Sequence, residues 1–165
     1  MKGQRETIVA YDPDDHIRVF DEGGKQEWKS AEKYGGSTLH YLSSYGKSPG
    51  ETDKPIYLPM RLTALKPDKD GKVQVITIRN FDMADRKLEA FRSFSEAQIV
   101  GFAWDGLGLQ PEWRTRKMTG CIRDFAIGDF DNDGELEMVC AVVLDEGRII
   151  TTVPKSLVIA LKFAK

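Results

Sequence analysis

The sequence has little cysteine, little histidine and no strong excess of either charge. Two cysteines among 165 residues are too few for a disulfide scaffold and form no CxxC pair, so zinc and thiol redox sites are not indicated. The 24 Lys and Arg residues nearly balance the 26 Asp and Glu residues, which disfavours nucleic-acid or anionic-membrane partners. Neither a membrane-spanning apolar run nor the apolar part of a signal peptide is present. The composition, 41% hydrophobic and 30% charged, predicts one globular domain.

Short β-branched and aromatic runs, closed by Gly, Asp, Asn and Pro, dominate the chain and predict strands. Helical periodicity occurs only at 83–95, which suits either a short helix or a loop. Residues 34–55, rich in Gly, Ser, Tyr and Pro, are expected to form a long loop. The predicted strands are 7–11, 17–21, 26–30, 61–65, 73–79, 98–104, 112–116, 122–128, 136–144 and 157–163.

A hairpin-like segment occurs twice, 63 residues apart, since alignment of Gly71 with Gly134 superposes residues 65–75 on residues 128–138. A second similarity relates residues 21–30 to residues 105–115. In both, a turn containing glycine leads into a strand with a tryptophan beside a basic residue, and we expect these tryptophans to be packing anchors. The chain therefore carries about two and a half β repeats, beginning part-way through the first unit.

Residues 136–144 are apolar on both faces of the predicted strand, apart from Glu137. This pattern is typical of a strand that is covered on both sides. Antiparallel sheets stacked around an axis, as in a β-propeller, have this property. We therefore predict an all-β fold of about two and a half to three antiparallel, four-stranded β-propeller blades. Residues 5–60 would form an incomplete first blade with a long loop, residues 61–116 the second blade and residues 117–165 the third.

The turn that follows the strand 122–128 is rich in oxygen ligands. Its acidic side chains at positions 1, 3, 5 and 9 and its carbonyl at position 7 belong to Asp129, Asp131, Asp133, Glu137 and Glu135. Hard oxygen ligands from several directions suit Ca²⁺, and Gly134 permits the sharp turn that makes them converge. Position 12 is Cys140 rather than a glutamate and the flanks are predicted strands, so the loop is not an EF-hand. The alternative is an Asp-rich turn that binds no ion.

The related loop at residues 66–74 departs from this pattern. It keeps Asp68 and Asp70 but has Lys66 at position 1 and Gln74 at position 9. A lysine ammonium in the first ligand position could replace the charge of a cation while the shape of the turn persists. We therefore expect this second copy to bind no ion.

Cys121 and Cys140 are predicted to be free thiols. If Ile127 pairs near Val139 across the acidic loop, Cys121 lies roughly 16 Å from Cys140 along the partner strand. A disulfide needs Cα atoms within about 7 Å. This register therefore excludes an intramolecular bond.

The segment FAIGDFDNDG at residues 125–134, followed by Glu137, resembles the FG-GAP/VCBS repeat of integrin-like β-propellers. The resemblance is partial over residues 63–113. Three further segments resemble the C-terminal half of bacterial VCBS-repeat propeller proteins: residues 104–109, 113–115 and 120–125. The resemblance implies a closed ring of blades, Ca²⁺ held by the five acidic-loop residues named above, and a periplasmic, outer-membrane or secreted location.

A propeller typically has at least four blades, whereas 165 residues hold about 2.6 units of 63 residues. Two explanations fit this difference. The chain would be the C-terminal part of a larger exported bacterial protein, or it would pair its exposed strand edges with another chain, as in a homo-oligomer.

The predicted function is a non-catalytic, calcium-binding module that acts in binding or scaffolding, with an unknown protein or glycan as ligand. One alternative is a hydrolase or lyase hosted by the propeller, but its best candidate residues, Asp105, Asp124 and His40, are scattered with no motif between them. Another alternative is a structural subunit that completes its ring with a second chain. No nucleic-acid partner and no membrane insertion by this chain are expected.

Overall fold

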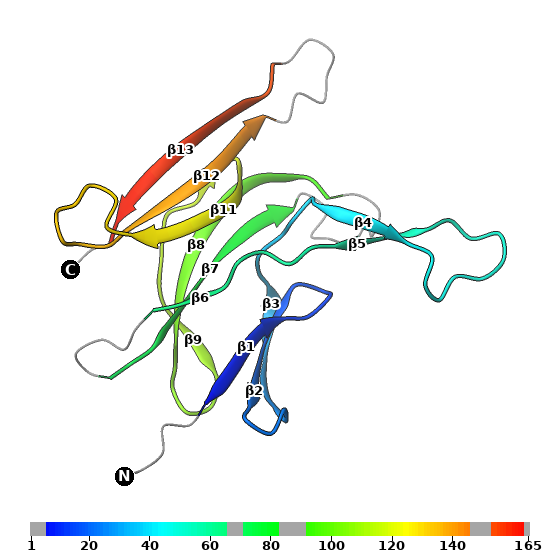
Figure 1. Cartoon of the computed structure of the whole chain (residues 1–165), viewed down its shortest axis with the longest axis horizontal. Helices are drawn as coiled ribbons and strands as arrows, with labels where there is room; N and C mark the ends of the chain where they lie inside the picture. Colours follow the sequence, from blue (N-terminus) through cyan, green and yellow to red (C-terminus); the bar gives the residue numbers. More distant parts are fainter. Residues whose placement is uncertain (1–5, 66–70, 83–91, 146–152, 164–165) are drawn as a thin grey trace.

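The computed structural model describes residues 6–65, 71–82, 92–145 and 153–163. Every regular element among these residues is a β-strand, which confirms the all-β prediction (Figure 1). The described part of the chain has no helix long and apolar enough to cross a membrane. The strands are β1 (Thr7–Tyr11), β2 (His16–Asp21), β3 (Gln26–Lys33), β4 (His40–Ser43), β5 (Lys54–Tyr57), β6 (Thr63–Ala64), β7 (Gln74–Asp82), β8 (Phe94–Trp104), β9 (Leu109–Arg114), β10 (Met118–Thr119), β11 (Cys121–Gly128), β12 (Glu137–Asp145) and β13 (Lys155–Lys162).

The strands form three antiparallel sheets and a two-stranded ribbon. The first sheet has the order β1-β2-β3, and the third sheet has the order β11-β12-β13. The central sheet has the order β6-β7-β8-β9, with β10 also paired to the start of β8. In Figure 1 the green central strands lie between the blue first sheet and the yellow-to-red third sheet. The two-stranded ribbon, formed by β4 and β5, projects away from these sheets.

The core consists of two layers, one on each face of the central sheet. Ile76 and Ile78 of β7 pack in one cluster with residues of the third sheet such as Met138. Val75, on the opposite face of β7, packs in the other cluster with Ile17 of the first sheet. Successive residues of a strand point to opposite faces, so a strand covered on both sides must be apolar at consecutive positions. Residues 75–78 of β7 are accordingly all buried, and three of these four residues are apolar.

The third sheet is covered on only one face within the described chain. On β12, Met138, Cys140 and Val142 are buried against the central sheet, whereas Ala141 on the other face is exposed. We expected this strand to be covered on both sides. The strands that have two covered faces are β7 and β8, because they belong to the sheet in the middle of the stack.

The expected long loop at 34–55 contains a hairpin instead. Strands β4 and β5 pair from His40 with Tyr57 to Ser43 with Lys54. Tyr41 and Leu42 are 56% and 64% exposed, so the hairpin buries neither face well. The alternation that identifies a half-buried strand is therefore absent from its sequence. The other ambiguous segment, 83–95, lies largely outside the described residues, and its last two residues begin β8.

The register of the third sheet differs slightly from the predicted one. Ile127 pairs with Met138 rather than Val139, and an irregularity between Ile122 and Asp124 shifts the pairing further along β11. Cys121 therefore lies opposite Val143, while Cys140 lies opposite Phe125. Both cysteines are buried and free, as predicted.

The repeated turn-and-tryptophan unit has the same local structure in the first and the central sheet. Asp21 Oδ1 accepts hydrogen bonds from two backbone amides of its own turn, and Asp105 Oδ1 does the same in the turn before β9. Trp28 follows the first turn and lies against Gly108 of the central sheet. Trp113 follows the second and lies edge-on to Phe163, with ring centroids 5.8 Å apart. Each tryptophan therefore packs against the next sheet, which confirms its predicted role as an anchor.

Asn80 of β7 connects the segments that lead out of the first sheet and into the third. Its Nδ2 donates to the carbonyl oxygens of Gly36 and Ile122 at 2.8 and 2.9 Å, and its Oδ1 accepts from the Ile122 amide at 3.0 Å. The side chain is 1% exposed. A buried amide that is satisfied in this way fixes its neighbours, because each lost bond would leave a buried polar group unpaired.

Candidate metal centre

The acidic loop predicted from the sequence connects β11 to β12. Two of its residues have left-handed backbone conformations, Asn132 with φ of 61° and Gly134 with φ of 86°. Glycine and asparagine tolerate this region better than other residues. Their placement curls the chain, so that successive backbone amides point at the carboxylates of the same loop.

These amides fix the three aspartates. Asp129 accepts hydrogen bonds from the amides of Asp133 and Gly134 at 3.1 and 3.0 Å. Asp131 accepts a second bond from the Asp133 amide at 3.2 Å, and Asp133 accepts one from the Glu135 amide at 2.9 Å. The carboxylates are therefore held in position by the turn rather than free to rotate in solvent.

Glu137, the first residue of β12, differs from the aspartates because its side chain is almost completely buried. It is only 3% exposed. Its Oε2 accepts a hydrogen bond from the Phe130 amide at 2.9 Å, but no described residue donates a hydrogen bond to Oε1. A buried carboxylate oxygen without a donor is costly, and a bound cation would remove that cost.

The structure brings three of the predicted ligands together. One carboxylate oxygen each from Asp129, Asp131 and Glu137 lies within 4.8 Å of the other two. Oxygens on the coordination sphere of Ca²⁺ are about 2.3–2.6 Å from the ion, hence at most about 5 Å apart. Asp133 lies in the same turn but is not part of this group. Glu135, whose backbone carbonyl is the fifth predicted ligand, precedes Glu137 by two residues. The donor set fits an oxygen-binding cation such as Ca²⁺.

Sequence reasoning missed Lys162, which is the main cation at this loop. Lys162 lies on β13 directly opposite Glu137 in the strand register. Its Nζ is 3.0 Å from Asp131 Oδ2, 2.5 Å from Asp133 Oδ2 and 3.7 Å from Glu137 Oε1. No local pattern could reveal it, because strand pairing brings it to the loop from 25 residues beyond Glu137.

Lys162 and Asp133 shift each other's pKa. The hydrogen bond from Lys162, followed by that from the Glu135 amide, lowers the pKa of Asp133 below its usual value. Hydrogen bonds to Asp133 and Asp131 raise the pKa of Lys162. Opposite charges at short range favour the charged form of each group. The contact with Lys162 therefore favours the ionised form of Asp133.

The second copy of the loop is described only at its end, because residues 66–70 lie outside the described residues. Gln74 is the counterpart of Glu137. Its Oε1 accepts a hydrogen bond from Trp113 Nε1 at 3.1 Å, and its Nε2 donates to Glu112 at 3.2 Å. The side chain is thus engaged with β9. That this copy binds no ion stays a prediction.

The residues considered for acid–base chemistry lie in three different places. Asp124 is on β11, where two hydrogen bonds from Arg61, at 2.9 and 3.1 Å, are the main cause that lowers its pKa. Asp105 caps the turn before β9. His40 is on the exposed strand β4 beside the ring of Tyr57, with centroids 5.2 Å apart. The structure does not bring these three side chains into one site.

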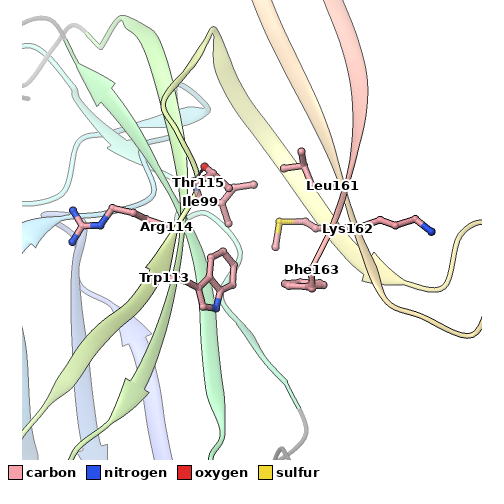
Figure 2. A pocket seen from close by; sticks show the side chains of 8 residues that line it. Ile99, Trp113, Arg114, Thr115, Leu161, Lys162 and Phe163 are labelled. Carbon is pink, nitrogen blue, oxygen red and sulfur yellow. Dashed lines mark hydrogen bonds between the residues drawn. The ribbon is translucent and has the colours of Figure 1, made fainter. Parts of the chain in front are cut away.

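A cleft of about 320 Å³ separates the central sheet from the third sheet. Figure 2 shows Ile99 and Trp113 on one side of it, facing Leu161 and Phe163 on the other. The side chain of Lys162 runs away from this cleft, toward the opposite face of the third sheet. The cleft is mostly apolar, and the acidic loop does not line it.

Comparison of the chain with known protein families, curated proteins and solved structures found no match. The FG-GAP/VCBS resemblance therefore depends on the sequence motif itself. The geometry of the acidic loop is the feature from which a function can be argued.

Proposed function

We propose that this chain is a non-catalytic, calcium-binding β-propeller module of the FG-GAP/VCBS kind, which acts in binding or scaffolding. The loop at 129–137 would hold a Ca²⁺ ion that ties β11 to β12. The module would bind a protein or a glycan, and the chain would work outside the cytoplasm as part of an exported bacterial protein.

The stacking of the sheets supports the propeller part of this proposal. Of the five strands in the central sheet, β6 to β9 follow one another in sequence order, and other sheets cover both faces of the central sheet. By the repeated hairpins, β11, β12 and β13 correspond to β6, β7 and β8, whereas β1, β2 and β3 correspond to β7, β8 and β9. One complete blade between two incomplete blades accounts for this arrangement.

The single observation that carries the calcium proposal is the buried Oε1 of Glu137, to which no described residue donates a hydrogen bond. One carboxylate oxygen of Glu137 lies within 4.8 Å of carboxylate oxygens of Asp129 and Asp131. Ca²⁺ prefers such hard oxygen ligands and accepts irregular geometry, whereas Mg²⁺ demands a near-ideal octahedron at about 2.0–2.1 Å. The Ca²⁺ would be structural, because it would stabilise the hairpin and not take part in a reaction.

The test is thermal unfolding of EDTA-treated protein with added Ca²⁺ or Mg²⁺. Because only the folded loop binds the ion, free Ca²⁺ at about 100 times Kd should raise Tm by about 5–10 °C. Mg²⁺ should raise it much less. Asp131→Ala should abolish the rise, whereas Asp53→Ala, an exposed aspartate in the turn after β4, should keep it. A Tm unchanged by Ca²⁺, or an equal rise in Asp131→Ala, would show that the loop is only a turn.

One observation favours the second candidate, a subunit that completes its ring with another chain. Strand β13 pairs only with β12 among the described residues, whereas its counterpart β8 is followed by β9. Val158 on β13 is 72% exposed. An open apolar edge of this kind accepts a further strand.

A further inference from the structure

We infer that Lys162 is an intramolecular competitor for the cation site, so that Ca²⁺ binds by displacing its ammonium group. This inference rests on the proposed function and adds the residue that sets the calcium affinity. Lys162 would act as a tethered cation that reduces the repulsion among the carboxylates of the acidic loop when no metal is bound.

The geometry places Lys162 on two of the carboxylates that a metal would need. Its Nζ is 3.0 Å from Asp131 Oδ2 and 3.7 Å from Glu137 Oε1, and both residues belong to the converging carboxylate group. A Ca²⁺ ion on these two carboxylates would lie next to the ammonium. Two cations at such a distance repel each other, so the two occupants exclude each other.

Charge explains why the ammonium does not satisfy the loop completely. Asp129, Asp131, Asp133 and Glu137 bring four negative charges, and Lys162 neutralises one of them. The buried Oε1 of Glu137 is still without a hydrogen bond while Lys162 is in place. A divalent ion compensates more of this charge than an ammonium group does, so exchange favours the metal once enough is present.

Lys162 is able to leave the loop because it lies at the surface. Its side chain is 54% exposed, on the last strand of the third sheet, and it points away from the intersheet cleft (Figure 2). The aspartates that it contacts, Asp131 and Asp133, are 51% and 40% exposed. Displacement therefore requires only a rotation of the lysine side chain into solvent.

The experiment is calcium titration by calorimetry on EDTA-treated full chain. Exposed ion pairs are individually weak, so loss of the three Lys162 contacts in Lys162→Met should tighten Ca²⁺ binding about three- to tenfold. Lys155→Met, at the exposed start of the same strand, is the matched control and should bind as the unaltered chain does. Lys162→Arg keeps the positive charge and should also keep the weaker affinity.

Thermal unfolding supplies a second measurement that does not depend on the heat of binding. In EDTA, Lys162→Met should melt below the unaltered chain, because its four carboxylates repel one another without a counter-ion. In saturating Ca²⁺ this order should be reversed or the difference should disappear. Equal affinities of Lys162→Met and the unaltered chain would overturn the competitor role and leave the calcium site standing. Absence of binding in both would overturn the proposed function as well.

Discussion

Asp12 shows how single residues stabilise the turns of this protein. Its Oδ1 accepts hydrogen bonds from the amides of Asp14 and His16, and its Oδ2 is paired with Arg18 at 2.8 Å and Lys29 at 3.2 Å. Burial by itself would raise the pKa of the Asp12 carboxyl, but the His16 amide and the two cations together lower it to about 2. In the first sheet, the charge of a buried carboxylate is thus compensated by Arg18 and Lys29.

This shift predicts a pH dependence of stability. The pKa of Asp12 is below its ordinary value of 3.8, so its contribution is complete above about pH 5 and is lost as the pH falls toward 2. Asp12→Asn should reduce the free energy of unfolding in urea by about 2 kcal/mol at pH 6 and much less at pH 2.5. Asp14→Asn, which changes an exposed residue of the same turn, should have little effect. A constant Asp12→Asn deficit across this range would contradict the assignment.

At the scale of the elements, glycines opposite tryptophans make room for the indole rings, within the central sheet and between the first sheet and the central sheet. A Cβ atom on Gly101 would lie 2.2 Å from the ring of Trp113 on the neighbouring strand, and one on Gly108 would lie 2.3 Å from the ring of Trp28. Neither ring can move easily, because each is packed against an adjacent sheet. Each tryptophan ring therefore occupies the space that a side chain on the facing glycine would need.

We expect Gly108→Ala to separate the first sheet from the central sheet. Overpacking of this kind costs about 1–3 kcal/mol, measured as the change in the free energy of unfolding in urea. Gly23→Ala is the matched control, because a Cβ at this turn position would make an ordinary contact of 3.4 Å with Asp21. Equal stability of the two variants would mean that Trp28 has room to adjust.

At the scale of the whole molecule, the chain exposes more surface than a compact protein of its mass. Its accessible surface is 11,250 Å², whereas a compact monomer of 18.6 kDa exposes about 8,200 Å². Much of the third sheet's outer face is apolar, including the exposed Ala141 and Val158. The excess of about 3,000 Å² is larger than each partner's share of a standard interface, about 800 Å².

We therefore expect two copies to associate through β13, because an antiparallel strand pairs with its own copy about a two-fold axis. Light scattering after size exclusion should give about twice the mass of one chain. Val158→Lys should produce a monomer, whereas Ile8→Lys, on the edge strand β1 where Ile8 is 56% exposed, should not. A monomeric unaltered chain, or dissociation by Ile8→Lys alone, would exclude β13 as the interface.

Local hydrophobic patterns predicted most strands, but they failed where a strand buries few side chains or is interrupted by an irregularity. The runs around β7 and β12 are β-branched and apolar, so their strands are evident without a structure. The exposed hairpin of β4 and β5 buries little and leaves no alternation to detect. The irregularity in β11 added a further shift to the predicted register, because a bulge has no clear signal in the residues around it.

The sequence by itself determined the all-β class, the repeated hairpins and the acidic loop with Asp129, Asp131 and Glu137, since each depends on residues close together in the chain. Only the tertiary structure decided that Glu137 is buried, that no described residue donates a hydrogen bond to its Oε1, that Lys162 lies opposite it, and that Asn80 joins segments leading to two sheets. These features depend on strand pairing and sheet stacking between residues far apart in sequence. The energetic contributions of these residues depend on how deeply they are buried and on the distances between charges, and neither quantity can be inferred from neighbouring residues in the sequence.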